Sequence, residues 1–277
     1  MKLGIKIFIS IGVLVVVFGL PLILGTEERQ AFELSPVVGL KLSLFEHKGL
    51  YMMHHLMAFI PVFYFGICLG MANYRTQSLR YMAATLIVAP IYLIWDACFN
   101  QWGIWGFNDR YITGFRIGGL PWEEWVWFFI IPFCSFFVHT HVRENIRLNT
   151  KWDSWLVWII LPILLIIYAN TWEKMYSAWS VGSVIVILVW ILIWKREGIG
   201  IFMISFGINC IPMFFFNGML TGLLTEQGLV VYHPGEFSGI RVGSYPVEDL
   251  GFGFSYLFGI YWVKQKLSDR FADNYEA

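Results

Sequence analysis

Two short segments of the chain carry the residues best suited to acid–base chemistry. Residues 114–124 read GFRIGGLPWEE, and residues 239–249 read GIRVGSYPVED. Proline fits the first turn of a helix, and acids there face the positive end of the helix dipole, so one copy alone is explained as a helix start. Recurrence of the motif, with apolar sequence directly after each copy, favours carboxylates placed at a membrane surface for a function. The acids are Glu123, Glu124, Glu248 and Asp249.

Paired acids of this kind predict one general acid and one general base. Adjacent residues of a helix point about 100° apart, so both members of a pair cannot face one cavity squarely. We expect one acid to line a site while the other pairs with the arginine of its motif, Arg116 or Arg241. An arginine favours the ionised carboxylate and apolar surroundings favour the neutral acid, so similar residues can take opposite roles.

Two further polar residues stand upstream of the motifs. Asp96 lies 18 residues before Gly114, and Asn217 lies 22 residues before Gly239, so they correspond if one loop carries four extra residues. Asp96 falls near the end of an apolar segment and is a third carboxylate candidate. A polar contact between packed helices is the alternative explanation for it.

Aromatic residues make up 19% of the chain and are dense around the acids. Tryptophan and tyrosine belts at the membrane interface account for most of them. Aromatic faces also stabilise cations without offering a nucleophile or a base. Acids beside aromatic rings are what protonation of an alkene requires, because a carbocation formed in water is captured. The candidate substrate-binding residues are Trp102, Trp105, Trp122, Trp125, Phe215 and Phe216, together with Arg116 and Arg241.

Membrane helices must position these residues. The chain is 58% hydrophobic and 14% charged, with a net charge of +0 that gives no indication of a nucleic-acid partner. Its apolar blocks have the length needed to cross a bilayer. We therefore predict an all-α integral membrane protein with about eight transmembrane helices. The expected spans are 4–24, 51–72, 82–99, 121–141, 154–170, 176–194, 199–219 and 246–264.

The two motifs also predict an internal repeat. Each opens the last span of a four-span set, and four is even, so the two four-helix repeats have the same orientation in the membrane. The polar segment 141–153 divides the chain, which gives repeats at 1–145 and 146–277. More lysine and arginine fall in the segments expected inside than outside, which favours cytoplasmic termini at the plasma membrane.

Sequence signatures of bound cofactors are missing. There is no G-x-G-x-x-G fingerprint after a strand and no P-loop. The histidine pairs His54–His55 and His139–His141 fall on different spans, and the four cysteines form no C-x-x-C pair, so we expect no metal site. We expect no cofactor.

The sequences GLPWEEWVWFF and GSYPVEDLGF resemble the paired motifs of the membrane-integral lycopene cyclase family, and this chain resembles a fused form of its heterodimeric bacterial, archaeal and fungal types. The second copy departs from the pattern by having Asp249 in place of glutamate. The resemblance implies that an acid protonates the terminal alkene of lycopene, a six-membered ring closes, and loss of a proton gives a β-ionone ring. The reaction needs no redox cofactor.

The resemblance also implies roles and partners. The four motif acids supply acid and base, Asp96 and Asn217 orient them or relay protons, and the tryptophans shield the cation. The substrate is lycopene or a similar linear polyene in the lipid bilayer, and a homo-oligomer is possible. Alternatives are a carotenoid hydratase, a cyclase of longer carotenoids, a proton or cation carrier, and a non-catalytic assembly subunit. Open points are which carboxylate is the acid, whether there are one or two sites, ring number, ring type and polyene length.

Overall fold

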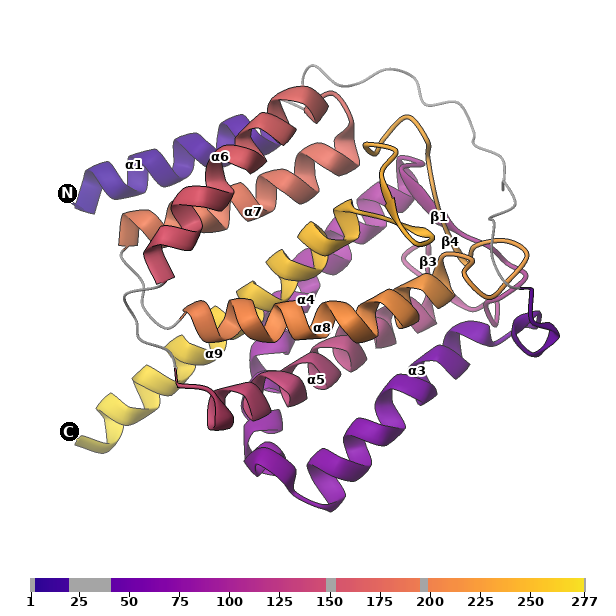
Figure 1. Cartoon of the computed structure of the whole chain (residues 1–277), viewed down its shortest axis with the longest axis horizontal. Coiled ribbons are helices and arrows are strands. Elements are labelled where there is room, and N and C mark those ends of the chain that lie inside the picture. The colour runs from indigo at the N-terminus through magenta and orange to yellow at the C-terminus, as the bar shows by residue number, and fades with distance from the viewer. Residues whose placement is uncertain (1–2, 20–40, 148–152, 195–198, 277) are drawn as a thin grey trace.

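The protein is an all-α membrane protein built from two repeats. Its computed structural model describes residues 3–19, 41–147, 153–194 and 199–276, and eight α-helices lie within these ranges (Figure 1). They are α1 (Leu3–Leu14), α3 (Leu50–Val62), α4 (Tyr74–Gln101), α5 (Trp122–Asn145), α6 (Asp153–Thr171), α7 (Met175–Trp194), α8 (Ile199–Leu220) and α9 (Glu248–Glu276).

Every expected span coincides with a helix, although the part of span 4–24 beyond residue 19 lies outside the described residues. Five helices in the described ranges are long and apolar enough to cross a membrane. They are Leu50–Cys68, Met71–Gln101, Trp122–Asn145, Met175–Trp194 and Ile199–Leu220. The proposed division between residues 145 and 146 falls at the end of α5 and stays a prediction.

Short helical pieces extend or precede some of these helices. A π-helical turn (Val15–Gly19) continues α1, and another (Phe63–Cys68) continues α3 just after Pro61, whose missing N–H interrupts the helical ladder. Two 3₁₀ turns, Ser43–Phe45 and Met71–Asn73, precede α3 and α4.

The two motifs fold into matching hairpins. β2 (Arg116–Ile117) pairs with β3 (Leu120–Pro121), and β5 (Arg241–Val242) pairs with β6 (Tyr245–Pro246). Gly118, Gly119 and Gly243 have positive φ in these turns, a conformation that glycine adopts without strain. Each hairpin ends at a proline one or two residues before the following helix, so the acids fall in the first turns of α5 and α9.

A third pair of strands joins the two halves. β1 (Trp105–Phe107) runs antiparallel to β4 (Val230–Tyr232), with Gly106 opposite Val231. An offset of 125 residues relates the two motifs, and the same offset relates Gly106 to Val231. Equivalent strands therefore pair about their common midpoint, as expected for a pseudo-twofold axis that relates parallel repeats.

The halves also exchange helix contacts. α4 packs against α9 and α5 packs against α8, so each half contributes to the other's core, while α1 and α6 both pack on α7 (Figure 1). Pro132 of α5 lacks an N–H, which leaves the carbonyl of Phe128 without its helical donor; the Tyr256 hydroxyl of α9 donates to it at 2.5 Å. The strands lie at one end of the bundle, and the outer ends of α1 and α9 lie at the opposite end (Figure 1).

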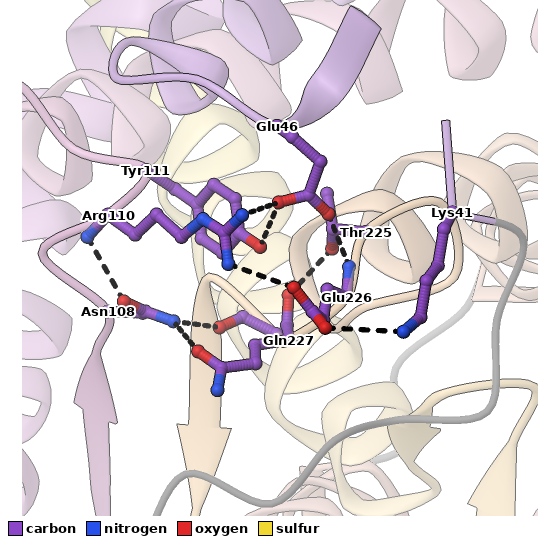
Figure 2. A network of polar contacts seen from close by, with 9 residues as sticks. Lys41, Glu46, Asn108, Arg110, Tyr111, Thr225, Glu226 and Gln227 are labelled. Carbon is purple, nitrogen blue, oxygen red and sulfur yellow. Dashed lines mark hydrogen bonds and ion pairs between the residues drawn. The ribbon is translucent and has the colours of Figure 1, made fainter. Parts of the chain in front are cut away.

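Loops from both halves meet in a polar network (Figure 2). The guanidinium of Arg110 contacts Glu46 at 3.0 Å and Glu226 at 3.1 Å, and Lys41 contacts Glu226 at 3.3 Å. Asn108 donates to the side chain of Gln227 at 3.0 Å. The loop after β1 and the loop before β4 are thereby linked to each other and to the segment before α3 by ion pairs and hydrogen bonds.

Candidate functional site

A cavity of about 380 Å³ lies between the two halves. Its walls come mainly from α3, α5, α8 and α9, and on α5 the lining runs from Glu124 to Val138. Fourteen helical steps separate these two residues and span roughly 21 Å, so the cavity is long and parallel to the helices. Carboxylates gather at the end nearest the strands, and mostly apolar side chains line the rest. This shape suits a rod-like apolar ligand that lies along the bundle.

The second acid of each motif lines this cavity. Glu124 accepts a hydrogen bond from the hydroxyl of Tyr51, and Asp249 accepts one from the hydroxyl of Tyr176. Each tyrosine precedes its acid by 73 residues, so the pairs are equivalent in the two repeats. Both carboxyl groups face one common cavity rather than two separate ones.

Asp249 is surrounded by donors. In addition to Tyr176, the amide of Asn217 donates at 2.6 Å and the hydroxyl of Tyr232 donates at 2.9 Å. Burial, followed by the charge of Asp249, raises the pKa of Tyr232 well above its usual value, so this phenol stays protonated and donates. Three donors to one carboxylate stabilise its ionised form.

Glu124 and Asp96 are poorer in donors. Asp96 accepts a hydrogen bond from the indole N–H of Trp105 at 2.7 Å, while its other oxygen is buried without a partner in the described chain. Asp96 and Glu124 line the same cavity and interact electrostatically. Two carboxyl groups that share an apolar site do not both ionise readily, so this pair favours retaining one proton.

The first acid of each motif faces its loop instead. One oxygen of Glu123 accepts from the backbone N–H and the hydroxyl of Thr113, both at 2.7 Å. One oxygen of Glu248 accepts from Ser177 at 2.5 Å and from the backbone N–H of Ser238 at 2.6 Å. These acids tie the loop before each hairpin to the head of the following helix.

The prediction that each motif arginine pairs with an acid of its own motif is wrong. Arg116 forms an ion pair with Asp109 at 2.8 Å and donates to the carbonyl of Gly119. Arg241 donates to the carbonyl of Ser244 and lies over the ring of Phe237. Both guanidinium groups brace their hairpins, because the turn folds them back toward the loop rather than toward the helix head.

The predicted aromatic residues divide between two locations. Trp105 and Phe216 line the cavity. Trp122 and Trp125 donate to Thr113 and to the carbonyl of Ile117 in the hairpin region. Trp102 packs on Phe99 and Trp179, and the side chain of Phe215 is exposed. The walls near the carboxylates are completed by Phe107, Trp127 and Phe252, which belong to the aromatic-rich sequence around the acids, and by Tyr256, which the sequence did not indicate.

Several polar residues of the cavity were also missed. Tyr51, Tyr176, Tyr232 and His54 all line it. The offset of 125 residues between the motifs relates Tyr51 to Tyr176, so extending the repeat alignment upstream would have identified this pair. His54 has no such signal, because the equivalent residue is Trp179. The assembled groups can protonate an alkene and surround the resulting cation with aromatic rings and one ionised carboxylate.

Comparison with known proteins agrees with this chemistry. A family model described as lycopene cyclase matches residues 47–142 and 173–267. The matched segments contain α3, α4, α7 and α8 and most of α5 and α9, the helices that line the cavity. No curated protein and no solved structure gives a significant match. Because the matched segments make up more than half of the chain, the protein belongs to the lycopene cyclase family, whose members act on linear carotenoids.

Proposed function

We propose that the protein cyclises the ends of lycopene, or of a similar linear polyene, to β-ionone rings inside the membrane. The observation that carries the proposal is the convergence of Glu124, Asp96 and Asp249 on one elongated, aromatic-lined cavity. A polyene is a long apolar rod, and such a cavity excludes the water that would capture a carbocation.

The roles follow from the donors around each carboxyl group. The Glu124–Asp96 pair supplies the proton to the terminal alkene, because it has few donors and favours a protonated member. Ionised Asp249, with its three donors, stabilises the cation that forms. Trp105, Trp127 and Phe252 line the space between them and offer aromatic faces to the positive charge.

One cavity serves both ends of the substrate. Each half contributes one motif carboxylate to the same space, so neither half has a complete site of its own. We propose that one end of the polyene reacts beside the carboxylates while the chain extends along the cavity. The product then turns and presents its second end to the same groups.

Expression in lycopene-accumulating cells, followed by pigment chromatography and mass spectrometry, tests the proposal. We expect cyclic products with the mass of lycopene. A mass increase equal to water would instead identify a hydratase, and unchanged lycopene beside correctly inserted protein would refute both activities.

The carboxylate roles are tested with Glu124→Gln and Asp249→Asn. Loss of a positioned acid or of a charged stabilising group lowers rates by roughly 10²–10⁴-fold, so we expect each variant to leave lycopene almost unconverted. Asp109→Asn is the control, because Asp109 is an exposed acid outside the cavity. Full cyclisation by both cavity variants would contradict the assignment.

A further inference from the structure

Two adjacent histidines of α3 lie beside the carboxylates of the cavity. His54 and His55 are both buried, and only His54 lines the cavity. Their Nδ1 atoms are 3.3 Å apart, within hydrogen-bond distance. The Nε2 atom of His55 lies 2.8 Å from the backbone carbonyl of Glu123. The proposed roles of the carboxylates do not use these imidazoles.

The hydrogen bonds determine which nitrogens carry protons. A carbonyl oxygen can only accept, so Nε2 of His55 bears the hydrogen. The Nδ1 atom of a neutral His55 is therefore an acceptor, and Nδ1 of His54 is its donor. The remaining nitrogen of a neutral His54, Nε2, then has a free lone pair. This atom is buried and forms no hydrogen bond by strict geometry among the described residues, and the His54 ring also lies beside the backbone carbonyl of Phe216 on α8.

Asp249, by contrast, already accepts hydrogen bonds from three side chains. One of its oxygens accepts from Tyr176, and the other accepts from Asn217 and Tyr232. Those donors stabilise the negative charge and weaken the tendency of the oxygens to take up a proton. Nε2 of His54 lines the same cavity and accepts no hydrogen bond from a described donor.

We propose that Nε2 of His54 is the base that removes the ring proton and that His55 is its relay; this rests on the proposed cyclase function. The carboxyl O–H of the Glu124–Asp96 pair gives its proton to the terminal alkene. The next double bond attacks the cation, forming the new carbon–carbon bond and moving the positive charge within the ring.

The C–H bond at the ring carbon that carries the polyene chain then breaks. Its electron pair forms the ring double bond, and its proton goes to Nε2 of His54. The Nδ1 proton of His54 passes to His55, whose Nε2–H remains bonded to the Glu123 carbonyl. One proton is later returned to the Glu124–Asp96 pair, so the reaction remains an isomerisation.

The two repeats differ at this position. The offset of 125 residues relates His54 and His55 to Trp179 and Ser180. Trp179 packs against Trp95 and Phe99, and the hydroxyl of Ser180 donates to the Glu248 carbonyl. The second half thus retains the bond to the helix head and has no imidazole at these two positions. The position of the base also decides ring type, because a proton lost from a neighbouring ring carbon gives a different double bond.

The test is His54→Gln in lycopene-accumulating cells, with protein level measured in membranes. We expect at least about a 10²-fold fall in conversion. The residual product is expected to shift from β-rings toward isomers with the double bond elsewhere. A loss of packing alone would lower yield without changing ring type. His139→Gln is the matched control, because His139 is a buried imidazole that bonds to Ser205 away from the cavity.

His55→Gln is the second variant and applies even if His54→Gln fails to accumulate. It retains the His54 ring and removes the relay imidazole, so we expect lower conversion and the same shift in ring type. Wild-type rate and ring type in either variant would overturn the proposal. Failure of the wild-type protein to make any cyclic product would instead overturn the proposed function itself.

Discussion

At the scale of single residues, the two motif carboxylates of the cavity differ in the number of their donors. Asp249 accepts from three side chains, whereas Tyr51 is the donor to Glu124. A hydrogen bond to a charged group contributes about 1.5–3 kcal/mol, which corresponds to at least a tenfold change in rate. We therefore expect Tyr232→Phe to lower the cyclisation rate roughly tenfold or more. Tyr51→Phe should have a smaller effect, because its acceptor, Glu124, belongs to the carboxyl pair that retains a proton.

Initial rates with membrane preparations and lycopene-loaded liposomes measure both effects. Tyr64→Phe is the control, because it removes the same hydroxyl from an exposed tyrosine outside the cavity. Equal losses in Tyr51→Phe and Tyr232→Phe would mean that the two carboxyl groups carry similar charge during the reaction.

Sequence spacing predicted part of this site. The angle between neighbouring helical residues predicted that one acid of each pair faces the cavity, and Glu124 and Asp249 do so. The same spacing could not identify the partners of the other two acids. Glu123 and Glu248 bind loop groups, because each chain folds back at its hairpin before entering the helix. Such tertiary contacts are not contained in helical periodicity.

At the scale of secondary-structure elements, Glu248 connects the loop before β5 with α7 and α9. Glu248→Ala would leave the Ser238 N–H and the Ser177 hydroxyl without their acceptor. Leaving buried donors unsatisfied costs about 1–3 kcal/mol. We expect a lower Tm in detergent, measured by loss of helical circular dichroism. Glu144→Ala, which changes an exposed acid, is the control, and an unchanged Tm in Glu248→Ala would exclude the structural role.

The loop network of Figure 2 should respond to acid. Hydrogen bonds from Arg110 and then Lys41 lower the pKa of Glu226 below its usual value. A lowered folded-state pKa adds stability above the unfolded-state value, and this contribution disappears as pH falls through the folded-state value. We expect Glu226→Gln to lower Tm slightly at neutral pH. The difference from the wild type should vanish once Glu226 is protonated.

Thermal unfolding of both proteins across an acid series measures this difference. High salt is the control, because it screens exposed charge pairs and should reduce the difference at neutral pH. A difference that persists in strong acid would point to lost packing rather than lost charge.

Helices and strands differed in how well the sequence predicted them. Apolar blocks of about twenty residues identified the helices, since length and hydropathy are both set by the bilayer. The paired strands were not predicted. β2, β3, β5 and β6 have two residues each, too short to show an alternating pattern. The repeated motif does show the glycines of these turns. Glycine alone does not predict a hairpin, however, because the hairpin forms only when the two flanking strands pair.

At the scale of the whole molecule, repeated motifs predicted two related halves but left open whether each half has a site. The structure places α5 of one half against α8 of the other, with Glu124 and Asp249 on the same cavity. Hydropathy cannot predict which helices exchange partners between halves. Exchange of this kind makes each half dependent on the other for a complete set of catalytic groups.

A single shared cavity makes a quantitative prediction about the product with one ring. If each half had its own site, Glu124→Gln or Asp249→Asn would disable one site and convert lycopene to the monocyclic product at a near-normal rate. With one cavity, each substitution removes a group needed for both ring closures, so we expect lycopene itself to remain. Time courses of lycopene, monocyclic and bicyclic pigments distinguish these outcomes. Separately expressed segments 1–148 and 149–277 provide the second arm. Either alone should be inactive and the pair active together, because the acid and its counter-charge come from different halves.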